Sequence, residues 1–425
     1  MLRASTGHGN DSLVQLLRKT CYADAAEPIA SLVRKMIVTY HNADMDEGDR
    51  QAKALSAQVF DCIASARQRG TVGLAQVYEV VVNSCTYRFL WQRRLARGCY
   101  NHVYYGTITA RTPHATRAHN VADGMLAPDP QSTVRGKPAS SSTPASDPQR
   151  ASDSVEMVVV KVTAQPDSDL RVYVLENVIN AVLANMDVMR DMVVPIHFPF
   201  KVAQSNRQIV RLGVVLQDPG HGHVGELIER MHQKHAKAGG ARDRVMFAML
   251  TALAAMLEQA QRAIQFQHRD LKCDNIMWVP VNETMQRVMP DDPTATFQFP
   301  SSMKFLFIDF GMARFMLDGE HIACDCMTSS LTFNPASDLQ NLCCTMVEDY
   351  GRELADMAPD FFKWIAGLCE PLFVKAREAA LPRTYRKLPQ ESRHKLLTTI
   401  VNEEKVQYFV PSSMLAVLKV YWQSV

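Results

Sequence analysis

The chain has 425 residues, of which 47% are hydrophobic and 21% charged, a composition typical of a globular protein of more than one structural unit. Its 46 lysines and arginines nearly balance its 44 aspartates and glutamates, and a formal charge of +2 creates no long-range field, so neither a nucleic-acid partner nor a membrane partner is expected. Ten irregularly spaced cysteines, a start without the apolar core of a signal peptide and the lack of a bilayer-length apolar run predict a soluble intracellular protein, cytoplasmic or nuclear.

Residues 1–86 are predicted to form a helical N-terminal extension. Segments such as "SLVQLLRKTCY" and "RQAKALSAQVFDCIASA" repeat apolar residues with helical period. From Tyr87 onward, aromatic and β-branched residues alternate in "FLWQRRLARGCYNHVYYGTIT", which predicts two strands joined by a turn. Residues 111–154 are rich in Pro, Ser and Thr and poor in large apolar groups, so we interpret them as an exposed, disordered insertion.

Strand and helix patterns continue beyond this insertion. A strand is expected at "VEMVVVKV", a helix from about Asp169 to Met186, and further strands at "VVPIHFPFKVA" and "IVRLGVVLQD". After the glycine-broken joint "DPGHGHVGEL" the chain is mainly helical, with a second insertion, "PVNETMQRVMPDDPTATFQFPSSM", between two strands. The order predicts an α+β fold with a small β-rich lobe, a larger helical lobe and a cleft between them, where ligands commonly bind.

A charged stretch, "HRDLKCDN", lies between the predicted core helix and a buried strand. It contains four charged or titratable side chains: His268, Arg269, Asp270 and Lys272. The stretch matches the catalytic loop of protein kinases, HRDLKxxN, at every fixed position, and residues 309–311 match their DFG motif after the predicted strand "KFLFI". Because two independent motifs occur in the right order and context, the chain resembles the protein-kinase superfamily, in a divergent form, over roughly residues 88–425.

The resemblance implies a bilobal kinase-like fold. The N-lobe would span about residues 87–218, including the insertion, and the C-lobe about residues 219–425. A C-lobe helix would begin near Asp338, in "SDLQNLCCTM", with that aspartate in a structural role.

The resemblance also implies ATP- and Mg²⁺-dependent phosphoryl transfer to Ser or Thr hydroxyls of protein substrates. Asp270 would accept or orient the proton of the acceptor hydroxyl. Lys272 would face the γ-phosphate, which favours Ser and Thr as acceptors. Asn275 and Asp309 offer the oxygen ligands that suit Mg²⁺.

Lys161 stands where kinases place their strand lysine, at the end of an apolar face formed by Val155, Met157 and Val159. An unpaired ammonium at such a place would be costly, so it needs anions. ATP phosphates would supply some, and Glu176, the one acidic residue inside the helix that follows, is the predicted carboxylate partner. The alternative is a lysine that snorkels from an edge strand.

The glycine-rich phosphate loop departs from the kinase pattern, because its three glycine positions read Ala, Gly and Asn. Asn tolerates unusual φ better than most residues, so the turn can survive. Val159 stands two residues before the lysine, where kinases usually have an alanine, and its larger side chain would narrow the adenine pocket. The hinge that joins the two lobes is assigned to the region of Leu216 and Asp218 from its position in the chain alone. The residues implied to contact the nucleotide are Ala96, Gly98, Asn101, Val103, Val159, Lys161, Leu216 and Asp218. The alternative for residues 95–106 is a plain hairpin.

No APE motif follows the DFG motif, which leaves the substrate class open. Residues that could take a phosphate and pair with Arg269, unless they form an ordinary polar loop, are Thr328, Ser329, Ser330 and Thr332. Two other functions remain as alternatives: a pseudokinase that binds or scaffolds, and a kinase-like enzyme that acts on a small molecule.

Overall fold

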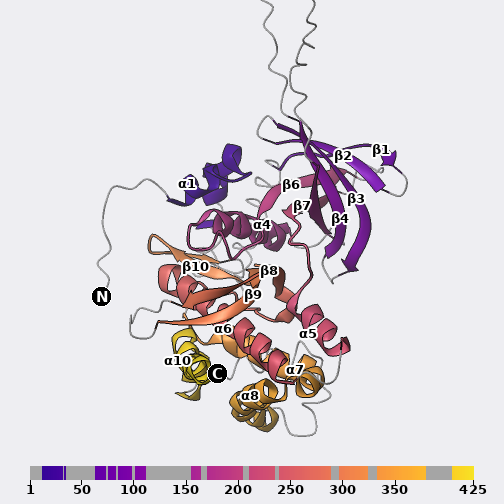
Figure 1. Ribbon diagram of the computed structural model, residues 1–425. Coiled ribbons are helices and arrows are strands. Elements are labelled where there is room, and N and C mark those ends of the chain that lie inside the picture. Colours follow the sequence, from indigo (N-terminus) through magenta and orange to yellow (C-terminus); the bar gives the residue numbers. More distant parts are fainter. Residues whose placement is uncertain are drawn as a thin grey trace, which may run out of the picture.

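The computed structural model describes residues 12–31, 33–34, 63–72, 75–82, 85–97, 101–111, 155–163, 170–203, 210–234, 239–288, 296–323, 333–379 and 404–425. These residues form an α+β fold, so the α+β part of the predicted fold class is confirmed. A curled antiparallel sheet lies beside α4, and the helices from α5 onward pack around two two-stranded sheets (Figure 1). None of the helices in the described ranges combines the length and apolar character that crossing a bilayer requires.

The large sheet has seven strands in the order β1-β2-β3-β4-β5-β7-β6, each antiparallel to its neighbours. Their bounds are β1 Arg67–Val72, β2 Ala75–Val82, β3 Cys85–Arg97, β4 Asn101–Arg111, β5 Val155–Thr163, β6 Ile196–Ala203 and β7 Val210–Gln217. Strands β3 to β7 occupy the segments in which strands were predicted.

The sheet curls until its two ends meet. Residues just before β1 pair with β6, where Ala66 N donates to Lys201 O and Lys201 N donates to Ala64 O, both at 2.9 Å. A core of alternating side chains fills the inside of the curl, among them Phe89, Val160 and Phe200. Closure of the sheet thus protects one apolar face without a covering helix.

Of the predicted helical extension, the part within residues 12–34 is mainly helical, whereas residues 1–11, 32 and 35–62 lie outside the described residues. Helix α1 covers Ser12–Arg18, a short 3₁₀ helix η1 covers Ala23–Ala25, and residues 26–31 are also helical. Residues 67–82 form β1 and β2, so the prediction of helix there is wrong. The reason is the run "VYEVVV", whose β-branched and aromatic side chains suit a strand once β3 offers a partner.

The helical part of the chain begins with α4, Leu170–Asn185, in the predicted position. The other elements are α5 Val224–Gln233, α6 Gly239–Ile264, η2 Cys273–Asn275, β8 Ile276–Val288, β9 Phe297–Phe307, β10 Arg314–Leu317, β11 Glu320–Ala323, α7 Ser337–Met357, α8 Pro359–Ala379, η6 Glu404–Phe409 and α10 Pro411–Ser424. One large apolar core joins α1, α4 and β7 to these helices.

The two predicted insertions have different outcomes. Most of the second one is built into the long β8–β9 ribbon, where Thr284 pairs with Ser301 and Val288 with Phe297. Alternate side chains of β9 are buried, so the ribbon belongs to the fold. Of the first insertion, residue 111 ends β4, and residues 112–154 lie outside the described residues.

Candidate functional site

The stretch "HRDLKCDN" connects α6 to β8 and is held by the first turn of α7. Asp338, fully buried, accepts hydrogen bonds from the backbone N–H of His268 at 2.8 Å and of Arg269 at 2.7 Å. Arg269 has a φ of 66°, a conformation uncommon for a residue with a side chain. The carboxylate of Asp338 therefore stabilises a backbone shape that the loop sequence alone disfavours.

His268 links the loop to the strand that precedes residues 309–311. Its Nε2 lies 2.9 Å from Ile308 O, and its ring is 5.4 Å from the ring of buried Phe310. Just before it, Gln267 exchanges two backbone hydrogen bonds with Arg314, at 2.8 and 2.9 Å. These contacts fix the loop against the segment that carries Asp309.

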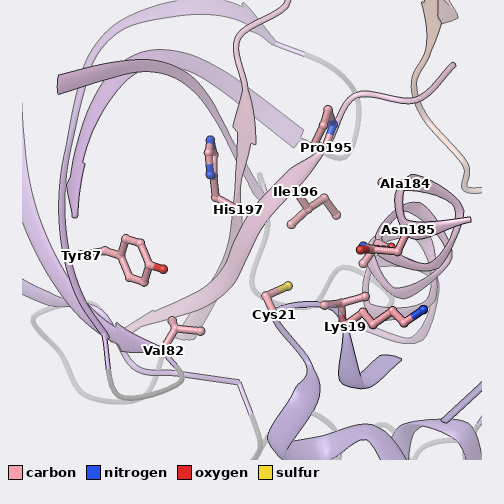
Figure 2. Close-up of a pocket in the computed structure, with 11 residues that line it drawn as sticks. Lys19, Cys21, Val82, Tyr87, Ala184, Asn185, Pro195, Ile196 and His197 are labelled. Atoms are coloured by element: carbon pink, nitrogen blue, oxygen red, sulfur yellow. Dashed lines mark hydrogen bonds between the residues drawn. The ribbon is translucent and has the colours of Figure 1, made fainter. Parts of the chain in front are cut away.

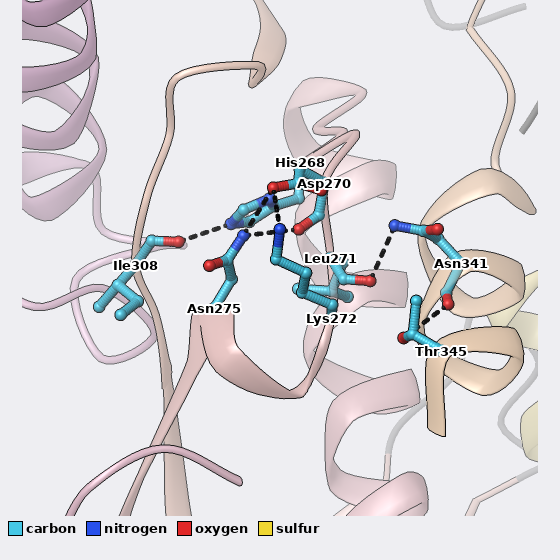
Figure 3. Close-up of polar contacts among 8 residues, drawn as sticks. All are labelled: His268, Asp270, Leu271, Lys272, Asn275, Ile308, Asn341 and Thr345. Atoms are coloured by element: carbon cyan, nitrogen blue, oxygen red, sulfur yellow. Dashed lines mark hydrogen bonds and ion pairs between the residues drawn. The ribbon is translucent and has the colours of Figure 1, made fainter. Parts of the chain in front are cut away.

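Asp270 is the centre of a polar cluster within the loop (Figure 3). Lys272 Nζ lies 2.9 Å from Asp270 Oδ2, and Asn275 Nδ2 donates to the same oxygen at 3.0 Å and to Asp270 O at 2.8 Å. Asn275 is buried, and its backbone carbonyl accepts from Ile308 N at 3.0 Å. The amide of Asn275 therefore turns its nitrogen toward Asp270 and its oxygen to the other side.

Lys161 and Glu176 form an ion pair between β5 and α4, at 2.7 Å between Nζ and Oε1. The pairing predicted from the sequence is present. Only 16% of the lysine side chain and 12% of the glutamate side chain are exposed. Burial raises the pKa of Glu176, the ammonium of Lys161 opposes this rise, and the charge of Asp309 adds to it.

Asp309 is close enough to this ion pair and to the cluster at Asp270 to act electrostatically on both. A Cβ added to Gly311 would stand 3.6 Å from Asp309 Oδ1 and 4.0 Å from Glu176 Oε2, which shows how close these groups are. Burial lowers the pKa of Lys272, but its hydrogen bond to Asp270 and the charges of Asp270 and Asp309 outweigh burial and raise that pKa. Asp309 thus acts electrostatically on both sides of the site.

The sheet contributes an apolar surface beside Lys161. Val103 pairs with Lys161 across β4 and β5, and Val159 pairs with Leu216 across β5 and β7. Cross-strand partners share a face, as do residues two apart on a strand, so all four side chains are on one face. Asp218 follows β7, and its Oδ1 accepts from Gly220 N at 2.9 Å.

The apolar face of β5 predicted to end at Lys161 is not buried along its whole length. Val155 and Met157, at its start, are 66% and 51% exposed. The buried residues of β5 are Val158, Val160 and Val162, which fill the inside of the curled sheet. The closure of the sheet decides this, and it cannot be seen in the alternation of one strand.

The glycine-loop positions are only partly described. Ala96 ends up in β3, opposite Val103, and Asn101 begins β4. Gly98 lies outside the described residues. The proposed phosphate acceptors Thr328, Ser329, Ser330 and Thr332 also lie outside them.

The sequence analysis did not predict how many contacts from α7 hold the HRDLKCDN stretch in place. Asn341 Nδ2 donates to Leu271 O at 3.0 Å, and Thr345 Oγ1 donates to Asn341 O at 2.9 Å. Together with Asp338 these residues recur at helical spacing and are buried. Polar residues on an otherwise apolar helix face were the signal that could have revealed this role.

No model of a known protein family and no curated protein matches the sequence. In the part of the chain that the structure describes, no group of three or more His, Cys, Asp or Glu side chains is arranged to hold a metal ion. The interpretation of the site therefore depends on its own geometry and chemistry.

Proposed function

We propose that this chain is a divergent protein-kinase-like phosphotransferase, which transfers a phosphoryl group from ATP to Ser or Thr hydroxyls of protein substrates. In this proposal the curled sheet with α4 is the small lobe, and the elements from α5 onward form the large lobe. Phosphoryl transfer needs mainly alignment and electrostatic stabilisation, so a suitable site is a set of well-placed charges.

One observation carries the proposal. Three chain segments far apart in sequence bring complementary charges together: Lys161 with Glu176, Asp309 beside them, and Asp270 with its two donors. If the HRDLKCDN stretch were only a surface loop with capped charges, it would not be expected to lie close to the largely buried ion pair between β5 and α4. Perturbed and interacting titratable groups of this kind are more frequent at functional sites than elsewhere.

The residues fit the cofactor expected from the kinase resemblance. Asp309 offers a carboxylate, and Asn275 offers the amide oxygen that its bonds to Asp270 turn away from that residue. Both are hard oxygen ligands, and Mg²⁺ is usually held by one or two such groups together with substrate phosphates. When bound, Mg²⁺ would supply positive charge that offsets the charge of the phosphates.

Each remaining residue has a separate task in this proposal. Glu176 orients the ammonium of Lys161, which contacts the phosphates of ATP. Asp270 accepts or orients the proton of the acceptor hydroxyl. Lys272, whose pKa is raised, stays charged at neutral pH and faces the transferred group. The face that holds Val103, Val159 and Leu216 covers the adenine.

The test is an assay of the full chain with labelled ATP and Mg²⁺, using a general protein substrate and, in parallel, small-molecule pools. Lys161→Met and Asp309→Asn should each abolish label transfer to Ser and Thr. Matched controls are Lys304→Met and Asp191→Asn, which change an exposed ion pair of 3.3 Å outside the site and should retain transfer.

The outcomes separate the alternatives. If label is transferred to small molecules but not to protein, the substrate is a small molecule and the proposed protein substrate is wrong. ATP binding without any transfer would identify a pseudokinase. Transfer that survives both site substitutions would contradict the proposed site.

A further inference from the structure

The N-terminal segment, residues 12–31 and 33–34, is packed into the main core of the molecule. Its apolar residues Leu13, Leu17, Ile29 and Val33 are at most 1% exposed and belong to the same core as α4. Helix α1 contacts α4 directly, and Figure 1 shows the two helices side by side. The segment is therefore an integral part of the fold around α4, the helix that carries Glu176.

The same segment also holds the β10–β11 hairpin, which follows Asp309 along the chain. Ser12 Oγ donates to Asp318 Oδ2 at the turn of the hairpin. From the other end of the segment, Arg34 Nε donates to Glu320 Oε2 at 2.8 Å. Two polar contacts thus tie both ends of one segment to the turn region of the hairpin, at Asp318 and Glu320.

We infer that the N-terminal segment is an intramolecular clamp that holds α4 and the β10–β11 hairpin in place, and thereby positions Glu176 and Asp309 for phosphoryl transfer. The segment contacts α4, which carries Glu176, and the β10–β11 hairpin, which begins shortly after Asp309. Without the clamp, α4 could shift and separate Glu176 from Lys161. The functional half of this inference rests on the proposed phosphotransferase activity, whereas the docking half does not.

A pocket of about 390 Å³ marks the place where the clamp meets the rest of the molecule (Figure 2). Its lining comes from the clamp, from the end of α4, from the start of β6 and from the sheet. Cys21 of the clamp lies in this wall as a free thiol, and its surroundings raise its pKa to about 12 through burial. Cys21 is only partly buried in the docked state, and release of the clamp would increase the exposure of the thiol and lower its pKa, so its alkylation rate reports docking.

The experiment uses the full chain with Arg34→Glu, Glu320→Arg and the double variant that restores the pair with its charges exchanged. Both side chains are substantially exposed, so the variants should still fold. The matched control is Arg18→Glu, which breaks an equally short Arg–Glu pair inside the clamp, at 2.7 Å to Glu27. Three quantities are measured: alkylation of Cys21 by iodoacetamide, resolved by peptide mass spectrometry, hydrogen exchange of α4 amides, and the transfer rate.

Each single variant should speed Cys21 alkylation and α4 exchange about two- to tenfold, because the pair is exposed and opposite charges become like charges. Transfer should slow by a similar factor. The double variant should return all three quantities to within about twofold of wild type, and Arg18→Glu should leave them near wild type. Rescue by charge exchange is the result that a merely structural role of either residue does not produce.

Single variants without effect on alkylation and exchange would overturn the clamp. A double variant no better than the singles would do the same. If docking responds as expected but the wild-type chain transfers no phosphate, the proposed function fails while the clamp stands. If transfer occurs and is indifferent to docking, the clamp has no part in positioning the site.

Discussion

Asp270 receives two hydrogen bonds on one carboxylate oxygen, one from the ammonium of Lys272 and one from the amide of Asn275. These donors orient the carboxylate, and a general base acts only within hydrogen-bond reach of the proton that it accepts. At the level of single residues, the function of the site therefore depends on the orientation of side chains such as Asp270, and neighbouring residues fix that orientation through hydrogen bonds.

Replacement of this carboxylate should be severe without being absolute. Asp270→Asn should lower the transfer rate by about a hundred- to ten-thousand-fold, the usual contribution of a positioned base. Nucleotide binding should remain, because the expected phosphate and metal contacts are made by other residues. Steady-state assays check the rate and ligand-induced thermal shifts check binding. Asp187→Asn, at a side chain 94% exposed outside the site, should leave the rate unchanged.

Glu176 should make stability depend on pH in a specific direction. Its pKa is raised by burial above the ordinary value of 4.5, so the folded chain binds this proton more tightly than the unfolded chain does. Its contribution to the free energy of unfolding is therefore largest below that value and declines as pH rises through the folded pKa.

Urea denaturation of wild type and of Glu176→Gln checks this dependence between about pH 4.5 and pH 8. The difference in unfolding free energy, wild type minus variant, should fall as pH increases, because only wild type titrates at this position. A difference that grows with pH would mean that the pair with Lys161 outweighs burial.

The residues of the site were predictable to different degrees. Glu176 could be identified as the partner of Lys161 because it is the one acidic side chain on a helix of clear period. The bonds of Asp338 to two backbone N–H groups depend on the loop conformation at Arg269, and no residue pattern specifies that conformation. Sequence therefore identified the chemical groups better than it identified what holds them.

At the scale of elements, alternating aromatic and β-branched residues predicted strands β3 to β7. The hairpin of β3 and β4 is an example, because the two strands are joined by a short turn and pair with each other. Residues 67–82 were included in the helical extension, yet the short apolar run of β2 fits either structure, and its pairing with β1 and β3 makes it a strand. Tertiary context overrides local preference most easily in such short runs.

The close approach of β3 and β4 gives an element-level prediction. A Cβ at Gly106 would lie 2.1 Å from the carbonyl oxygen of Leu90, an atom of the neighbouring strand that cannot rotate away. Gly106→Ala should therefore force the strands apart and cost about 1–3 kcal/mol in unfolding free energy. The control Gly240→Ala, in the first turn of α6 with open space around it, should be neutral or stabilising by up to about 1 kcal/mol. Denaturant unfolding compares them, and equal effects of the two substitutions would refute the clash.

At the scale of the whole molecule, two separate apolar cores stabilise the fold. One fills the curled sheet, and the other joins the N-terminal segment and α4 to the large helices. Closure of the sheet brings Ala66 to Lys201 across a long stretch of chain, and such contacts leave no local trace in sequence. The α+β class was predictable from the order of patterns, whereas the curl and the docking of residues 12–34 were not.

The position of the site between the sheet and the helices predicts how a nucleotide affects the whole chain. A ligand held by Lys161 on one side and by Asp309 and Asn275 on the other would bind the folded chain and not the unfolded one. At a hundredfold excess over its Kd it should then stabilise the fold by about 2.7 kcal/mol, seen as a higher melting temperature. Lys161→Met should remove most of this shift, because it deletes the cation of the sheet side, while Lys304→Met should retain it. An equal shift in both variants would mean that the nucleotide binds somewhere else, and the proposed arrangement of Lys161, Asp309 and Asn275 around it would be wrong.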